Sequence, residues 1–308
     1  MTGATGFVGQ HVLSALGAAG KEIKVLGLGL SETAGRAIDI ANADAIDGII
    51  AREKPDAIIH LAAIALPRAA KDAPDRAWAV NFQGTLNIAE ALKRHRPDGH
   101  LIFASSSETY GATFARTTGP IHEDAALMPQ TVYAATKACA DLALGQMAAD
   151  GLDCIRFRPF NHTGPGQVPL YVVADFARQV AEIEAGKRDP VIRVGNLEAK
   201  RDFLDVRDVA RAYALAAISD HKASVDAAYN LASGKAVRIG DILESLISQS
   251  TTGIEIQTDA DRLRANDIAQ TLGDSTRARE AFGWSPMIAL KQTLAAVLDD
   301  QRAQVGKI

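Results

Sequence analysis

Near its amino terminus the chain reads Thr2-Gly3-Ala4-Thr5-Gly6-Phe7-Val8-Gly9, and an apolar helical pattern follows directly, through about residue 19. Glycines that open into a helix let backbone amides and the positive helix end approach a pyrophosphate, where side chains would obstruct it. A tight turn is the alternative for a glycine triplet taken alone. We expect contacts to a nicotinamide cofactor from this segment, through Gly3, Thr5, Gly6, Phe7, Val8 and Gly9.

Short apolar runs then alternate with longer helical patterns, which is typical of βαβ units around a parallel sheet. The patterns predict strands at residues 23–28, 37–40, 57–61, 100–105 and 153–158. They predict helices at residues 9–19, 43–52, 75–95 and 131–149. The expected fold class is α/β, with a Rossmann-like, doubly wound parallel sheet and a smaller carboxy-terminal α/β substrate domain.

The pattern loosens after Pro159, where glycine, proline and polar residues become frequent. We expect the dinucleotide-binding domain to hold residues 1–159 plus about 203–230, and the substrate domain to hold about 160–202 plus 231–308. Only Met1 and Thr2 precede Gly3, although a central strand needs about 5 to 6 residues. We therefore expect the natural protein to begin several residues upstream; an intact mass of the native protein equal to that of this chain would contradict this.

Composition limits the classes of function. The net charge of −4 offers no basic field for nucleic acid, so no such partner is expected. No apolar run approaches the roughly 18 residues of a membrane span. Cys139 and Cys154 suit neither a disulfide framework nor a metal site, and we expect thiols in a reducing compartment, a cytoplasmic protein and no metal.

Other segments are candidates for cofactor contacts. Asp39 and Ile40 close a predicted strand and could meet the adenine, while the small residues in Leu61-Ala62-Ala63 allow a dinucleotide to pass close to the chain. The position that usually separates NAD from NADP has no acid at the strand tip near Leu28 and no arginine before Arg36. NAD and NADP both remain open.

Tyr133 and Lys137 stand four residues apart on a predicted helix, so both side chains project from one face. A tyrosine that gives a proton to a carbonyl oxygen needs a pKa below its usual value near 10, and a neighbouring ammonium lowers it. Ser106 lies at the end of the strand before this helix, where open α/β sheets place their sites, and its hydroxyl can bond a substrate oxygen. The structural alternatives are an exposed tyrosine beside a lysine, and a serine-rich turn.

Several strings in the sequence resemble a known family. TGATGFVG, SSSETYG at residues 105–111 and YAATK at residues 133–137 look like the extended short-chain dehydrogenase/reductases, which act on nucleotide sugars. FNHTGPGQ at residues 160–167 and VGNLEAKRDFLDVRDVARAY at residues 194–213 are similar to the GDP-4-keto-6-deoxy-mannose reductases. The resemblance covers nearly the whole chain. It implies NADPH- or NADH-dependent reduction of a GDP-linked 4-keto-6-deoxy sugar to GDP-rhamnose, with the 6-deoxy-talose epimer also open.

The resemblance also implies roles for individual residues. Ser106 would polarise the keto oxygen, Tyr133 would donate the proton, and Lys137 would lower the pKa of the tyrosine and bond the nicotinamide ribose. The implied substrate contacts are Ser106, Ser107, Asn161, Arg201 and Arg264. Forked guanidinium groups suit a diphosphate. A solvated charge is the alternative for each arginine, and His162 could bond the substrate or be a packed histidine.

Glu108 keeps a second activity open. In the related GDP-mannose 4,6-dehydratases a glutamate two places after the catalytic hydroxyl helps to remove water, and Glu108 has that position here. GPGQ at residues 164–167 replaces the arginine-containing segment associated with the dehydratases, which favours the reductase. A 4-epimerase and a nucleotide-binding regulator without catalysis are further alternatives. Alanine-rich faces at residues 78–92 and 134–144 predict a homodimer through an intermolecular four-helix bundle.

Overall fold

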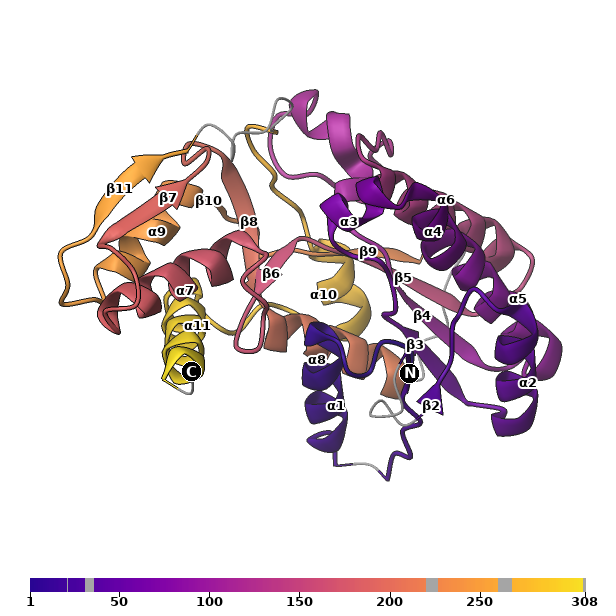
Figure 1. The fold of residues 1–308 in the computed structure, drawn as a ribbon. Helices are drawn as coiled ribbons and strands as arrows, with labels where there is room; N and C mark the ends of the chain where they lie inside the picture. Colours follow the sequence, from indigo (N-terminus) through magenta and orange to yellow (C-terminus); the bar gives the residue numbers. More distant parts are fainter. Residues whose placement is uncertain (21, 31–35, 220–226, 260–267, 307–308) are drawn as a thin grey trace.

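The computed structural model describes residues 1–20, 22–30, 36–219, 227–259 and 268–306 (Figure 1). Its first helices and strands are α1 (Phe7–Gly17), β1 (Leu28–Gly29), β2 (Arg36–Ala37), α2 (Ala43–Glu53), β3 (Ala57–His60), α3 (Pro67–Asp72), α4 (Pro74–Trp78), a π-helical turn (Ala79–Gln83), α5 (Gly84–His95), β4 (His100–Ala104), a 3₁₀ segment (Ser107–Ala115), α6 (Val132–Ala149) and β5 (Cys154–Pro159). The later ones are β6 (Asn161–Thr163), α7 (Val172–Glu184), β7 (Val191–Val194), β8 (Lys200–Asp205), α8 (Val206–Ile218), β9 (Ala228–Leu231), β10 (Ala236–Arg238), α9 (Ile239–Ile247), β11 (Glu255–Thr258), α10 (Thr276–Phe282) and α11 (Leu290–Val305).

A parallel sheet forms the centre of the larger lobe. β3, β4, β5 and β9 pair in that order, and β1 pairs with β2, all in parallel. The backbone of residues 1–3 lies between the two groups, because Gly3 N donates to Leu28 O at 2.9 Å and Thr2 N donates to Ile59 O at 3.0 Å. The glycine segment thus begins at the centre of the sheet, and the expected α/β class is confirmed.

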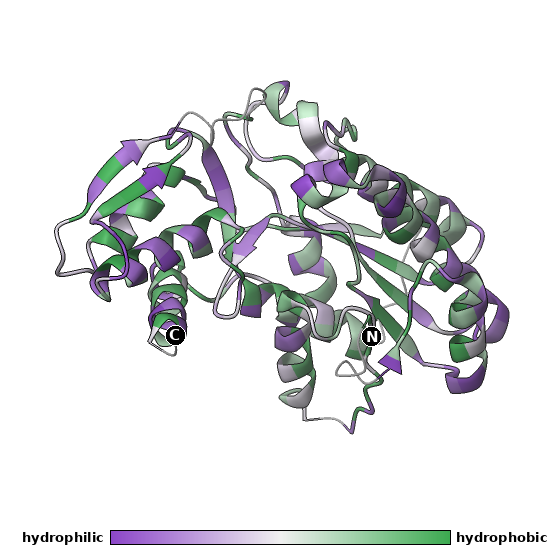
Figure 2. Cartoon of the chain, in the orientation of Figure 1, coloured by the Kyte–Doolittle hydropathy of each residue, from purple (hydrophilic) through white to green (hydrophobic). Residues whose placement is uncertain are grey.

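Side chains along each strand point alternately to the two faces of this sheet, so the hydrophobic core is divided between those faces. Ile59, Ile102 and Phe157 pack with α1, α8 and α10 on one face, whereas Ile58 and Phe103 pack with α2, α5 and α6 on the other. Successive strand side chains point to opposite faces, so strands buried on both sides read as continuous apolar runs. Figure 2 shows these strands as mostly hydrophobic ribbons between helices whose outer faces carry hydrophilic residues.

A second, smaller lobe follows β5. It holds β6, β8 and β10, the parallel pair β7 and β11, and the helices α7, α9 and α11, which share one hydrophobic cluster (Figure 1). β8 runs into α8, which returns the chain to the first face of the large sheet. α10 and the buried Trp284 also pack in that first cluster.

The structure corrects several predicted boundaries. The strand predicted at residues 23–28 is shorter and lies at Leu28–Gly29, where residues 1–3 and β2 supply hydrogen-bonding partners. The strand predicted at residues 37–40 is found at Arg36–Ala37. The predicted helix 75–95 is interrupted by the π-helical turn Ala79–Gln83, whose local geometry alanine and valine do not signal. The remaining predicted elements agree within one or two residues at each end, which is the usual uncertainty of element boundaries.

Candidate active site

The glycine segment forms a turn that only glycine fits. Gly3 has φ of +69°, and a Cβ there would lie 2.8 Å from Ala62 N; a Cβ on Gly9 would lie 2.2 Å from Gly3 O. Gly6 precedes α1 as its N-cap without a side-chain cap, so backbone amides and the positive helix end are presented without a covering side chain. This cradle fits the pyrophosphate of a dinucleotide.

A cavity of about 1020 Å³ lies between the two lobes, above the carboxyl ends of the sheet strands. The residues predicted from sequence that line it are Gly3, Thr5, Gly6, Phe7, Val8, Gly9, Leu61, Ala62, Ala63, Ser106, Ser107, Glu108, Tyr133, Lys137, Asn161 and Arg201. Pockets that hold small molecules and cofactors usually measure roughly 300–1,000 Å³. The volume here lies at the upper end of that range, which suits a ligand as large as a dinucleotide.

The catalytic candidates meet in one wall of the cavity. Ser106 follows β4, and its Oγ accepts a hydrogen bond from Glu108 N at 3.1 Å. Tyr133 and Lys137 lie on successive turns of α6, which begins after the Thr131 cap. Lys137 is buried, with its Nζ 4.3 Å from the centre of the Phe103 ring. The structure thus brings together the three residues whose roles the sequence predicts.

Burial is the largest influence on the pKa values of two titratable side chains in this wall, Tyr133 and Lys137. Burial raises the pKa of Tyr133 above its ordinary value, the Glu108 carboxylate raises it further, and a hydrogen bond with Ser106 acts in the opposite direction. Burial also lowers the pKa of Lys137 to about 7, which Asp141 partly offsets. Burial thus opposes the charged form of Lys137, and its predicted effect on the pKa of Tyr133 stays a prediction.

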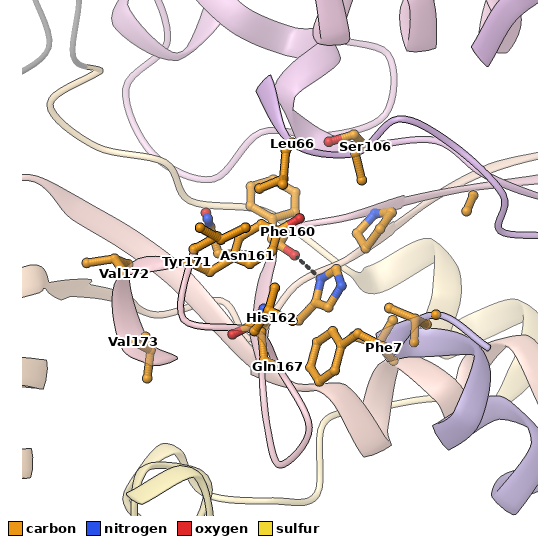
Figure 3. Close-up of a pocket in the computed structure, with 18 of the residues that line it drawn as sticks. Phe7, Leu66, Ser106, Phe160, Asn161, His162, Gln167, Tyr171, Val172 and Val173 are labelled. Carbon is orange, nitrogen blue, oxygen red and sulfur yellow. Dashed lines mark hydrogen bonds between the residues drawn. The ribbon is translucent and has the colours of Figure 1, made fainter. Parts of the chain in front are cut away.

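The second lobe supplies the opposite wall, as Figure 3 shows. Asn161 and His162 lie on β6; the His162 ring donates from Nδ1 to Phe160 O at 2.9 Å and stacks on the Phe7 ring with centroids 6.3 Å apart. Arg201 on β8 is held through its NH1 by Lys200 O and Ile268 O, at 2.9 and 2.6 Å. One edge of its guanidinium is thereby fixed while the side chain lines the cavity.

Two predicted residues, Asp39 and Ile40, are not among the described residues that line the cavity. Asp39 bonds Arg76 at 2.7 Å and Ala41 N at 3.0 Å, and Ile40 is buried against Gly84. Their predicted contact with the adenine stays a prediction. Arg264 lies outside the described residues, and so does its predicted contact with the diphosphate.

Sequence reasoning missed several residues around the site. Asp141 lies one turn beyond Lys137 and anchors Arg156 and Arg158, and the spacing of four from Lys137 was the available signal. Tyr171 and Leu66 also line the cavity (Figure 3), with no pattern in the sequence to mark them. Within the described ranges, no cluster of histidine, cysteine or acidic side chains is suited to hold a metal ion. None of the helices described there is long and apolar enough to cross a membrane.

A glycine cradle at a helix start, together with a serine, tyrosine and lysine at the carboxyl edge of a parallel sheet, defines a nicotinamide-dependent oxidoreductase of the Rossmann class. More particularly, the chain belongs to the NAD dependent epimerase/dehydratase family, whose model matches residues 1–232. It is an enzyme that uses a nicotinamide cofactor, NADP or NAD.

Three similar proteins span nearly the whole chain. GDP-6-deoxy-D-mannose reductase from Pseudomonas aeruginosa is 36% identical over 307 residues, covering 99% of this chain and 97% of the relative. UDP-glucose 4-epimerase from Mycolicibacterium smegmatis is 29% identical, covering 97% and 96%. The solved structure of RMD from Pseudomonas aeruginosa complexed with NADPH superposes with a TM-score of 0.86 at 33% identity, covering 98% of this chain and 97% of that one.

Proposed function

We propose that the protein reduces the 4-keto group of GDP-4-keto-6-deoxy-D-mannose with NADPH or NADH to give GDP-D-rhamnose. The observation that carries this proposal is the grouping of Ser106, Tyr133 and Lys137 in one wall of the cavity that the glycine cradle enters. The full-length similarity to GDP-6-deoxy-D-mannose reductase supports the choice of sugar and nucleotide.

The reduction adds a hydride to carbon 4 and a proton to its oxygen. The cofactor, when bound, supplies the hydride. Tyr133 gives the proton to oxygen 4, and the Ser106 hydroxyl bonds the same oxygen and polarises the carbonyl. Lys137 is placed to bond the nicotinamide ribose, and Ala62 and Ala63 leave room for the cofactor to pass over the sheet edge.

The diphosphate of the substrate is assigned to the second lobe. Asn161 is exposed to the cavity and can donate its amide to a phosphate oxygen, and Arg201 offers a fixed guanidinium. Ser107 lies beside Ser106 and is a further contact for the sugar. Arg264 remains the proposed second arginine.

Product analysis tests the proposal and its stereochemistry. The substrate is generated from GDP-mannose by a separate dehydratase, and the product formed with this protein and NADPH is identified by NMR. We expect GDP-rhamnose, the product to which the similarity to GDP-6-deoxy-D-mannose reductase points. GDP-6-deoxy-talose would keep the reductase but reverse the assigned face, and an unchanged keto sugar would contradict the proposed reaction.

A 4,6-dehydratase is the second candidate, and one observation favours it. Glu108 lines the cavity, and its charge acts on Tyr133. A dehydratase or a 4-epimerase regenerates its cofactor in each cycle and retains it. Oxidised cofactor bound one to one in the purified protein, together with conversion of GDP-mannose without added cofactor, would support the dehydratase. The reductase requires added NADPH instead.

We propose a homodimer through the helical faces at residues 78–92 and 134–144, in the cytoplasm, where the free thiols Cys139 and Cys154 would stay reduced. Trp78 and Leu142 are exposed apolar side chains on these helices, 37% and 60% accessible in the single chain. Leu142→Arg should convert the dimer into monomers, because the interface would have to bury an unpaired charge. Light scattering at micromolar concentration measures this, and a monomer mass for the unaltered protein would contradict the dimer.

We also retain the proposed division into a dinucleotide-binding domain of residues 1–159 plus about 203–230 and a substrate domain made of the rest. The separate hydrophobic clusters support it. α10 and Trp284 pack with the first cluster, so we assign them to the dinucleotide-binding domain.

A further inference from the structure

A buried histidine lies beneath the cofactor side of the cavity, at the end of β3. His60 is 1% exposed and belongs to no part of the mechanism above. Its Nδ1 lies 2.7 Å from Thr2 Oγ1, and its Nε2 lies 3.0 Å from Thr85 Oγ1. Both threonines are buried as well.

The neighbouring hydrogen bonds fix the direction of these two contacts. Thr85 Oγ1 donates its only proton to Asn81 O at 2.8 Å, so it must accept from His60, and Nε2 carries the proton. In the neutral ring Nδ1 is then the acceptor, and Thr2 Oγ1 donates to it. The same Thr2 oxygen accepts from Ala62 N at 3.2 Å.

The chain of hydrogen bonds continues through Asn81 in the π-helical turn. Asn81 Oδ1 accepts from Ile64 N at 2.8 Å, and Nδ2 donates to Ile64 O at 3.2 Å and to Thr136 Oγ1 at 3.0 Å. Thr136 Oγ1 donates in turn to Tyr133 O at 2.8 Å. A π-helical turn of this kind often marks a functional position, and here it directs the amide toward the site.

We infer that His60 is a positioning residue, which through Thr2, Thr85 and Asn81 holds the cofactor-lining segment 61–66 in fixed register with the catalytic helix α6. Leu61, Ala62, Ala63, Ala65 and Leu66 line the cavity, and the hydrogen bonds hold this segment at Ala62 and at Ile64. Because the same series ends at the backbone of Tyr133, a shift of the segment would change both cofactor affinity and the alignment of the nicotinamide with the proton donor. The inference rests on the cofactor site of the proposed function and not on the identity of the sugar substrate.

The role requires a histidine that stays neutral. Burial lowers the pKa of His60 to about 3, and the charge of Lys137 acts in the same direction. Phe103 is the ring neighbour of both His60 and Lys137, with the His60 ring 5.7 Å from it. A neutral ring with one donor and one acceptor keeps the hydrogen bonds in one direction, so His60 holds the segment without transferring protons.

The test uses a matched pair of variants at Thr85, with the full-length protein and NADPH binding measured by cofactor fluorescence. Thr85→Val keeps the side-chain shape but leaves His60 Nε2–H unpaired. We expect NADPH affinity to fall by about tenfold, because segment 61–66 can then shift to relieve the unpaired donor and no longer keeps the position that the cofactor needs. Thr85→Ser keeps the hydroxyl and should bind NADPH within about twofold of the unaltered protein. Thr293→Val, a buried threonine of α11 in the other lobe, is the control for stability alone.

Two outcomes would overturn the inference. In the first, Thr85→Val and Thr293→Val bind NADPH with equal affinity and differ from the unaltered protein only in lower thermal midpoints. The Thr85 hydroxyl would then stabilise the fold without positioning the cofactor segment. The second is an NMR titration in which the His60 ring gains a proton between pH 5 and 8, or carries its neutral proton on Nδ1. NADPH binding needs no sugar, so failure of the proposed reaction would leave both measurements interpretable.

Discussion

Replacement of Tyr133 by phenylalanine is expected to reduce turnover by about a hundredfold or more, the usual contribution of a positioned general acid. In the proposed mechanism Tyr133 delivers its phenolic proton to the keto oxygen, which leaves a phenolate that must take up a proton before the next turnover. Its pKa is raised by burial, so the protonated form is the one present at neutral pH. NADPH affinity should change little, because the lost hydroxyl acts on the substrate oxygen.

Steady-state kinetics with NADPH and the keto sugar measure this effect. Tyr229→Phe is the matched control, since it removes a tyrosine hydroxyl from the hydrophobic cluster behind the sheet and outside the residues that line the cavity. Turnover of Tyr133→Phe equal to that of the control would remove Tyr133 from the mechanism. A loss confined to NADPH binding would assign Tyr133 to the cofactor alone.

Asp141→Asn is expected to destabilise the fold by about 3 to 5 kcal/mol, the cost of leaving a buried charge without its partner. Asp141 is fully buried, and it accepts from Arg158 Nε and NH2 at 2.9 and 2.8 Å and from Arg156 NH1 at 3.1 Å. Burial alone would raise the pKa of this carboxyl, but the hydrogen bonds and charge of Arg158 hold it below its ordinary value. Two buried guanidinium groups would lose the carboxylate that pairs with both of them.

Urea denaturation of Asp141→Asn and Asp47→Asn measures the difference. Asp47 pairs with Arg94 at the surface, where solvent screens the interaction, so its replacement should change the unfolding midpoint little. Asp141 also raises the pKa of Lys137, so its loss should leave Lys137 less protonated at neutral pH. Equal midpoints for the two variants would show that the buried cluster contributes no more than a surface pair.

Local sequence signals were sufficient for the parts of the site that depend on spacing within one element. The glycine segment, Ser106 at a strand end, and the spacing of four between Tyr133 and Lys137 each have a direct geometric meaning, and the structure places them in one cavity. The alternation of apolar runs likewise predicted the parallel sheet.

Features that depend on distant partners could not be predicted in this way. His60 reads as part of an apolar strand, and its role depends on Thr2 and Thr85, which are 58 and 25 residues away. The burial of Lys137, which lowers its pKa to about 7, could not be predicted, because sequence spacing carries no measure of burial. The short ladder at Leu28–Gly29 depends on which backbone lies beside it, which no local pattern reports.

The most direct test of the proposed function is the loss of the reduced-nicotinamide absorbance when the purified protein and NADPH meet GDP-4-keto-6-deoxy-mannose, formed in place from GDP-mannose by a separate dehydratase. The account predicts oxidation of one NADPH for each keto sugar consumed, with none when the dehydratase is left out and nearly none with Tyr133→Phe. NADPH that binds the protein, as fluorescence would show, but is not oxidised in the presence of the keto sugar would contradict the reductase.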